Sequence, residues 1–194
     1  IVPSGGRTGL SAGAVASAGE LVVSMERLSK VGEVNVLERT VEVQAGVLTA
    51  TVQQAAAESG LCYPVDFASA GSSQIGGNIA TNAGGIHVLS SGMTREWVAG
   101  LTVVTGAGEV LDLNQGLVKN NTGYDLRHLF IGSEGTLGLI VSATLRLAPR
   151  KPSKTVLLLG VPSMERVMSV LRTFQEKVDL HAFDFFCDLA LQRV

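Results

Sequence analysis

The stretch that decides the fold is Gly71-Ser-Ser-Gln-Ile-Gly-Gly-Asn-Ile-Ala-Thr-Asn-Ala-Gly-Gly85. Its glycines alternate with Asn78, Thr81 and Asn82, whose amide and hydroxyl groups can donate hydrogen bonds to a ring carbonyl or a ribose. Because glycine has no Cβ atom, the backbone at these positions can approach a ligand closely. A close-packed turn whose asparagines cap helices fits the same residues, so this stretch alone leaves a ligand site and a structural turn open.

Another glycine-rich stretch, Ser4-Gly-Gly-Arg-Thr-Gly-Leu-Ser-Ala-Gly13, directly follows a predicted strand. Its backbone N–H groups can converge on an anion such as pyrophosphate. It is not a Rossmann fingerprint, since the G-x-G-x-x-G order and a following amphipathic helix are absent, and it lacks the Gly-Lys-Ser/Thr of a P-loop. Taken alone it predicts a tight turn, with a phosphate contact as the alternative. We call residues 4–13, 71–85 and 132–138 the first, second and third glycine segments.

Composition limits the class of protein. The chain has 194 residues, of which 46% are hydrophobic and 16% charged, so it can bury a core. A formal net charge of −2 offers no field for binding nucleic acid or an anionic membrane. Cys62 and Cys187 stand alone without CxxC spacing, which predicts buried thiols in a reducing compartment. Neither an apolar run of about 20 residues nor a signal peptide is present, so we expect a soluble, cytoplasmic chain.

Both ends of the sequence predict a fragment of a longer protein. Ile1 opens on Ile-Val-Pro-Ser-Gly-Gly, which is typical of a strand that runs straight into a loop. Residues Phe183 to Val194 are largely apolar and predict the start of a further element.

Hydrophobic periodicity predicts a mixture of strands and helices between the glycine segments. Gly60 is placed to end one helix, and Gly106-Ala-Gly108 predicts a hairpin turn. Pro149 to Ser153 is the best domain boundary, because two prolines and two charges interrupt an apolar sequence. The predicted strands are Leu21–Met25, Val41–Ala45, Trp97–Thr105, Glu109–Leu113, Leu137–Leu147 and Val156–Val161, and the predicted helices are Leu48–Ser59 and Ser163–Glu176, the latter with Met164, Val167, Val170, Leu171 and Phe174 on its inner face.

A third motif indicates the family to which the chain is similar. It reads Asn121-Thr-Gly-Tyr-Asp-Leu-Arg-His-Leu-Phe-Ile-Gly-Ser-Glu-Gly-Thr-Leu-Gly138. Together with SGGRTGL and IGGNIATNAGG, it closely resembles the FAD-linked oxidases of the vanillyl-alcohol oxidase superfamily, in the D-lactate, glycolate and D-2-hydroxyglutarate dehydrogenase branch. The resemblance implies an α+β fold: a PCMH-type FAD-binding domain of two α/β subdomains over residues 1–149. Residues 150–194 would begin an α+β substrate (cap) domain, whose start the stretch from His181 to Phe186 also resembles.

The resemblance also assigns residues to the cofactor. One set is similar to a pyrophosphate cradle built mostly from backbone amides, a second to the wall around pyrophosphate and isoalloxazine, and a third to a further patch of FAD contacts. The cradle is Ser4, Gly5, Gly6, Arg7, Thr8, Gly9 and Leu10; the wall is Pro64, Gly71, Ser72, Gly76, Gly77, Asn78, Thr81, Asn82 and Gly85; the patch is Glu134, Gly138 and Ile140.

Several polar residues keep two interpretations. Arg7 can neutralise phosphate charge or can be a solvated loop arginine. Asp66, Tyr124 and Asp125 can contact the cofactor, but helix capping and a core hydroxyl bond are the favoured alternatives. His87 and His128 suggest acid–base groups, yet a lone histidine without a visible carboxylate or metal partner is more often structural.

The chemistry that the resemblance implies is hydride removal from Cα of a D-2-hydroxy acid to flavin N5, while a base takes the hydroxyl proton. D-2-hydroxyglutarate is the preferred substrate, followed by D-lactate and glycolate. In that family the base, the arginines for the substrate carboxylate and any divalent metal belong to the C-terminal part, so no catalytic residue or metal ligand is assigned here. Non-covalent FAD is expected, because the first glycine segment has no histidine or cysteine for a flavin linkage.

Two alternatives and several partners complete the predictions. One alternative is a non-catalytic FAD-binding subunit of a larger oxidase complex. The other is an NADPH-dependent reductase on the same fold, which the order TNAGG, NTGYDL, GSEGTLG disfavours. The expected electron acceptor is a quinone or an electron-transfer flavoprotein, the expected assembly is a homodimer, and nucleic acid is not an expected partner.

Overall fold

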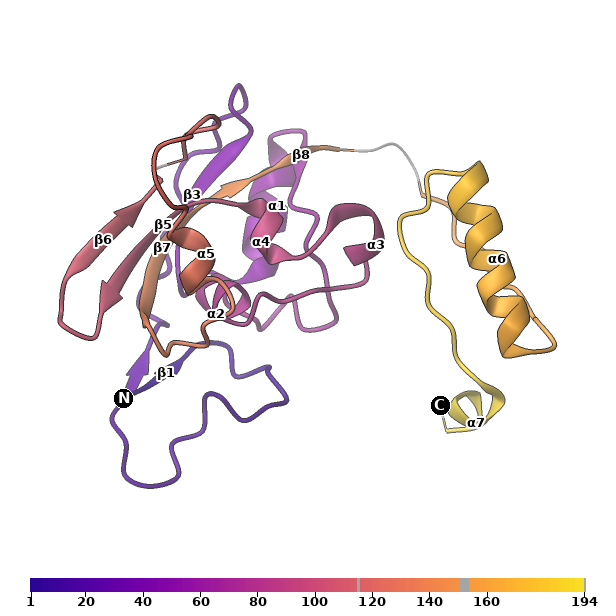
Figure 1. The fold of residues 1–194 in the computed structure, drawn as a ribbon, viewed down its shortest axis with the longest axis horizontal. Coiled ribbons are helices and arrows are strands. Elements are labelled where there is room, and N and C mark those ends of the chain that lie inside the picture. Colours follow the sequence, from indigo (N-terminus) through magenta and orange to yellow (C-terminus); the bar gives the residue numbers. More distant parts are fainter. Residues whose placement is uncertain (115, 151–153, 194) are drawn as a thin grey trace.

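The centre of the fold is an antiparallel four-stranded sheet (Figure 1). The computed structural model describes residues 1–114, 116–150 and 154–193. The strands are β3 (Thr40–Gln44), β5 (Val98–Thr105), β6 (Val110–Leu113) and β7 (Gly138–Arg146), in the spatial order β3-β7-β5-β6. β7 therefore lies between two strands that precede it in the chain, with Val41 opposite Leu145 and Leu101 opposite Ala143.

One face of this sheet carries the core. Side chains alternate along a strand, so Val41, Val43 and Leu145 are buried on one side while Glu42 is exposed on the other. Helices α1 (Thr49–Glu58) and α2 (Ile75–Ala80) contribute to the same apolar cluster. Ile75, Ile79 and Val52 are fully buried there. Burial of such side chains contributes about 1.5–3 kcal/mol each, which fixes α2 at the centre of the molecule.

Two small sheets and three short helices surround the core. β1 (Val2–Ser4) pairs in parallel with β2 (Val22–Ser24), and the first glycine segment leaves from the end of β1. β4 (Leu61–Cys62) pairs with β8 (Ala148–Pro149). The short helices are α3 (Val88–Ser91), α4 (Thr94–Trp97) and α5 (Arg127–Phe130).

The predicted elements up to residue 149 are confirmed to within a few residues, and so is the α+β class. Gly60 ends α1 with φ +73°, a left-handed value that suits glycine. The turn between β5 and β6 has Gly108 at φ +82°, and the Thr105 N–H donates to the Glu109 carbonyl. Hairpins of this kind depend on neighbouring residues, which is why the sequence predicts them well.

In the C-terminal part, one predicted element is confirmed and another is wrong. Helix α6 (Met164–Lys177) is present, with Val167 buried on its inner face, although Met164 is exposed. The strand predicted for Val156–Val161 is wrong, since these residues are exposed, form no regular secondary structure and pair with no strand among the described residues. Residues 151–153 of the predicted boundary lie outside the described residues, so the division into two domains stays a prediction. The last helix is α7 (Asp188–Leu191).

The prediction of two buried thiols is also wrong. Cys62 is partly exposed on β4, and Cys187 is exposed directly before α7. Neither is in a disulfide in the described part of the chain. Across residues 1–114, 116–150 and 154–193, no helix is both long enough and apolar enough to cross a membrane.

Candidate cofactor-binding site

The three glycine segments, far apart in the sequence, meet around α2. A Cβ atom on Gly6 would overlap the carbonyl oxygen of Ser72, so the first and second segments touch backbone to backbone. A Cβ on Gly135 would lie 2.6 Å from Cγ of Pro3, which brings the third segment to β1. The Glu134 N–H donates to the Ala80 carbonyl at 2.9 Å, so the third segment also caps the end of α2.

The first segment forms an open loop of backbone donors. Arg7 has φ +54°, a left-handed value of the kind found in anion-binding turns of backbone N–H groups. No described residue accepts a hydrogen bond from the N–H groups of residues 6 to 10. The Arg7 guanidinium lies 3.7 Å from the Glu26 carboxylate, and both side chains are about two-thirds exposed at 68% and 63%. Ser4 is buried, Gly5 and Gly6 are half-buried, and Arg7, Thr8, Gly9 and Leu10 are exposed.

The glycines of the second segment divide into two kinds. A Cβ on Gly76 would lie 2.7 Å from Cβ of Ala45, and one on Gly85 would overlap the Asp66 carbonyl, so these two glycines permit close packing against other parts of the protein. Gly71 and Gly77 have nothing within 4 Å of a Cβ position and are exposed. Only Gly71 and Gly77 therefore leave room beside the backbone for a ligand.

The polar residues of the second segment are partly committed to the protein. The Asn78 side chain is buried, and its Nδ2 donates to Thr49 Oγ1 at 2.6 Å. Thr49 Oγ1 in turn lies 2.8 Å from Ser73 Oγ. Thr81 is exposed and donates from Oγ1 to the Gly77 carbonyl at 3.0 Å. Ser72 is exposed, Pro64 is half-buried, and Asn82 is half-buried with φ +48°.

Gln74 is a candidate that the sequence analysis missed. Its side chain is buried, and its Oε1 has no hydrogen-bond partner within the described part of the chain. A Cβ on Gly5 would lie 3.2 Å from that oxygen, so the acceptor sits under the first segment. A buried acceptor without a donor costs free energy, and a ligand hydroxyl or amide can remove that cost. The available signal was a long polar residue within a motif of small and apolar residues.

In the third segment only one predicted residue is open to solvent. Glu134 is exposed with φ +52°, and its Oε2 lies 3.6 Å from a Cβ position on Gly13. A Cβ on Gly138 would lie 2.6 Å from the Val104 carbonyl, so this glycine serves strand packing. Ile140 is buried in the core cluster.

Both candidate histidines are held by neighbouring groups. His87 Nδ1 lies 3.3 Å from the Pro64 carbonyl, and its Nε2 lies 3.2 Å from Lys154 Nζ. Since a carbonyl only accepts and an ammonium only donates, Nδ1 carries the proton and Nε2 is the acceptor. His128 Nδ1 accepts from Arg95 Nη1 at 2.7 Å. These contacts support the structural interpretation of both rings.

Asp125 serves a buried arginine. Its carboxylate accepts from Arg127 Nε at 2.8 Å and also from Nη2, while Arg127 Nη1 donates to the Val98 carbonyl at 2.9 Å. The hydrogen bonds from the Arg127 side chain hold the pKa of Asp125 below its ordinary value. Asp66 Oδ1 accepts from Gln53 Nε2 at 3.2 Å. Tyr124 is 94% exposed, so the core hydroxyl bond suggested for it is wrong.

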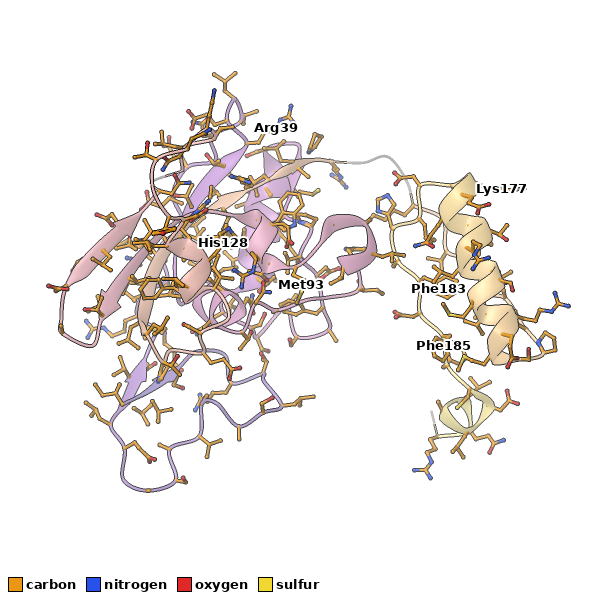
Figure 2. The ribbon with its side chains drawn as sticks, in the orientation of Figure 1. Arg39, Met93, His128, Lys177, Phe183 and Phe185 are labelled. Atoms are coloured by element: carbon orange, nitrogen blue, oxygen red, sulfur yellow. The ribbon has the colours of Figure 1, made fainter. Side chains whose placement is uncertain are left out.

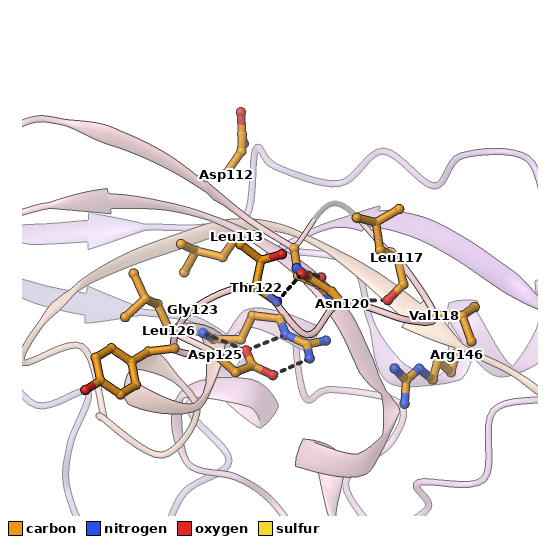
Figure 3. Close-up of a pocket in the computed structure, with 13 residues that line it drawn as sticks. Asp112, Leu113, Leu117, Val118, Asn120, Thr122, Gly123, Asp125, Leu126 and Arg146 are labelled. Atoms are coloured by element: carbon orange, nitrogen blue, oxygen red, sulfur yellow. Dashed lines mark hydrogen bonds and ion pairs between the residues drawn. The ribbon is translucent and has the colours of Figure 1, made fainter.

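A pocket of about 180 Å³ lies beside this pair, between β6 and the loop that follows it (Figure 3). It contains none of the residues assigned to the cofactor, and Arg127 and Asp125 form part of its lining. The described residues hold no cluster of three or more histidine, cysteine, aspartate or glutamate side chains suited to a metal ion.

The converged segments fit FAD. Open N–H groups in residues 6 to 10 match a pyrophosphate, because backbone donors in a left-handed turn bind anions. Gly71 and Gly77 leave space for close approach of a flat or extended group, and Gln74 Oε1 offers an unused acceptor. The contact of each individual residue with FAD stays a prediction.

Comparisons with known proteins agree with this fit. A family described as "FAD binding domain" matches residues 1–114, more than half of the chain. The chain is 60% identical to a D-2-hydroxyglutarate dehydrogenase of Stutzerimonas stutzeri over 194 residues, covering 100% of this chain and 42% of that protein. It is 38% identical to a D-lactate dehydrogenase of Anaerostipes hadrus over 178 residues, covering 90% of this chain and 36% of that protein.

A solved structure of alkyldihydroxyacetonephosphate synthase matches with a TM-score of 0.65 and 28% identity, over 76% of this chain and 27% of that chain. The chain thus spans about two-fifths of the length of the two curated relatives. The family resemblance and the predicted cofactor are both confirmed. The chain belongs to the FAD binding domain family within the vanillyl-alcohol oxidase superfamily of FAD-linked enzymes, and FAD is its cofactor.

Proposed function

We propose that the protein is an FAD-dependent dehydrogenase that oxidises a D-2-hydroxy acid to the 2-oxo acid, with D-2-hydroxyglutarate as the preferred substrate. The observation that carries the proposal is the 60% identity, across the whole chain, to a protein named D-2-hydroxyglutarate dehydrogenase. Relatives named D-lactate dehydrogenase and glycolate oxidase subunit are 38% and 40% identical, so D-lactate and glycolate both follow D-2-hydroxyglutarate.

The residues of this chain would hold and orient the cofactor. Bound FAD supplies a two-electron acceptor at N5 for the hydride from Cα of the acid. The N–H groups of residues 6 to 10 would hold the pyrophosphate non-covalently, and the open faces of Gly71 and Gly77 would admit the rest of the molecule. Since His87 and His128 already contact neighbouring groups, neither is assigned as the base that takes the hydroxyl proton.

The partners follow from the same proposal. A quinone or an electron-transfer flavoprotein would reoxidise the flavin, because a dehydrogenase needs an acceptor other than the substrate. A homodimer and a cytoplasmic location remain predictions from the sequence.

The test is anaerobic reduction of the flavin in the full-length protein. The protein should purify yellow and release FAD, not FMN, on denaturation. D-2-hydroxyglutarate should bleach the flavin absorbance faster than D-lactate or glycolate, and the L-enantiomers should leave it unchanged. FAD that none of these acids reduces would contradict the proposal and favour a non-catalytic FAD-binding subunit.

A further inference from the structure

Arg95 connects α4 to the loop that carries the third glycine segment. Its Nη1 lies 2.7 Å from His128 Nδ1 and 3.2 Å from the His128 carbonyl. Its Nη2 donates to the Ile131 carbonyl at 2.6 Å. The guanidinium therefore spans two carbonyls and one ring nitrogen, just before the chain reaches Gly132. Figure 2 labels His128 on α5 and Met93, two residues before Arg95.

The backbone of the same short helix holds the second glycine segment. The Arg95 N–H donates to Asn82 Oδ1 at 3.0 Å, and Asn82 is left-handed with φ +48°. Thr94 donates to the Ala83 carbonyl from its N–H at 3.0 Å and from Oγ1 at 2.7 Å. The turn that ends α2 is therefore fixed to the start of α4.

The two attachments meet at Gly132. A Cβ on Gly132 would lie 3.5 Å from Arg95 Nη2 and 3.5 Å from Cβ of Asn82, and the Gly132 N–H donates to the Ile79 carbonyl at 3.0 Å. Arg95 therefore contacts both segments. Its side chain donates to the Ile131 carbonyl, directly before the third glycine segment, and its backbone N–H donates to Asn82 in the second.

We propose that Arg95 is a positioning residue for FAD: together with the backbone hydrogen bonds from Gly132 to Ile79 and from Glu134 to Ala80, it holds the third glycine segment against the second. The inference rests on the proposed FAD-dependent function. The proposed role requires arginine and not lysine at position 95. A planar guanidinium donates to several acceptors at once with fixed geometry, whereas an ammonium on a flexible stem does not. Arg95 acts through Asn82 and Ile131 and is given no contact with substrate.

The experiment compares three variants of the full chain. Arg95→Met keeps the aliphatic length and removes the donors, Arg95→Lys keeps the charge, and Arg146→Met is the control. Arg146 is a similarly half-buried arginine on β7, outside the three glycine segments. The measurements are the FAD dissociation constant, the visible spectrum of the bound flavin, and the Tm of the FAD-free protein.

We expect Arg95→Met to bind FAD about ten-fold more weakly, which equals the loss of about 1.4 kcal/mol, and to shift the flavin spectrum. Arg95→Lys should recover only part of the affinity, and Arg146→Met should match the wild type in both measurements. Should Arg95→Met fail to fold, Arg95→Lys decides the question by itself, because it should bind FAD more weakly than the wild type whereas Arg146→Met should not.

A lower Tm with unchanged FAD affinity and an unchanged flavin spectrum would show a purely structural role and overturn the proposal. Equal losses in Arg146→Met would overturn it as well. A wild-type protein that binds FAD but oxidises none of the acids would refute the proposed reaction while the comparison of variants still decides on Arg95. A wild-type protein that binds no FAD would refute both.

Discussion

Gly6 and Ser72 lie so close that the carbonyl oxygen of Ser72 occupies the space where Gly6 would carry a side chain. This contact joins segments that are 66 residues apart in the sequence. It also explains why the first glycine segment can be an open loop, since the loop is fixed at its base while residues 7 to 10 extend into solvent.

Replacing Gly6 with alanine should disrupt this junction. The backbone must shift to admit the methyl group, so we expect Gly6→Ala to destabilise the protein by about 1–3 kcal/mol and to weaken FAD binding. Gly106→Ala is the matched control, because no atom lies within 4 Å of a Cβ at Gly106 and this glycine lies outside the three glycine segments. Chemical denaturation and FAD titration check both variants. Equal tolerance of the two changes would mean that the junction is not tight in solution.

Gly77 tests where the cofactor lies. A Cβ at Gly77 meets no atom from outside its own helix within 4 Å, so we expect Gly77→Val to fold. If FAD occupies that space, its affinity should fall at least about ten-fold, or 1.4 kcal/mol. Gly60→Ala is the opposite control: its φ of +73° makes alanine cost about 1–2 kcal/mol of stability, with FAD affinity unchanged. Full flavin content in Gly77→Val would show that the second wall is misplaced.

The sequence correctly predicted elements that depend on near neighbours and wrongly predicted one strand, whose formation depends on a distant partner. The hairpin at Gly106 to Gly108 and the helix end at Gly60 follow from local backbone preferences. Val156–Val161 has the composition of a strand, but a strand exists only when a partner supplies hydrogen bonds, and none does so among the described residues. The pairing of β3 with β7 was likewise invisible, because no local signal links residues so far apart.

The candidate site likewise has features that the sequence predicted and features that it could not. Motif resemblance identified the glycine segments, yet it could not separate Gly76, which packs on Ala45, from its neighbour Gly77, which faces open space. Asn78 has the right chemistry for a flavin contact, but its amide nitrogen is bonded to Thr49, a residue that no motif includes. Arg95 was missed because a single arginine in a short helix carries no pattern.

Low pH should lower the stability of the folded protein by protonating Asp125. Its pKa is lowered in the folded state by the side-chain hydrogen bonds from Arg127. A carboxyl whose pKa is lower in the folded state stabilises the protein at pH values above its unfolded-state pKa, about 3.9 for aspartate. This stabilisation is lost as the pH falls through the folded-state pKa. Urea denaturation of Asp125→Asn should therefore show lower stability at neutral pH and a weaker decline below pH about 4. Parallel pH curves for the two proteins would contradict this.

Tyr63 offers a stabilising change. Its side chain is buried, and no described residue bonds to its hydroxyl. Tyr63→Phe keeps the ring packing and removes the unpaired hydroxyl, so it should raise the free energy of unfolding by about 1 kcal/mol. Burial also raises the pKa of Tyr63, which costs stability at alkaline pH once the unfolded phenol loses its proton. The free energy of unfolding of the Phe variant should accordingly decrease less steeply than that of the wild type as the pH rises. A lower Tm for this variant would reveal a hydroxyl partner.

The position of β7 between β3 and β5 dictates an order of events as the chain leaves the ribosome. β3 and β5 are complete by residue 105, but the strand that joins them runs from Gly138 to Arg146. Until that strand has emerged, both edges stay unpaired, and such long-range pairing is slow and prone to aggregation. Gly13 of the first glycine segment likewise meets Glu134, which is made more than a hundred residues later. We therefore expect flavin supplied during synthesis to bind only after these residues have been made.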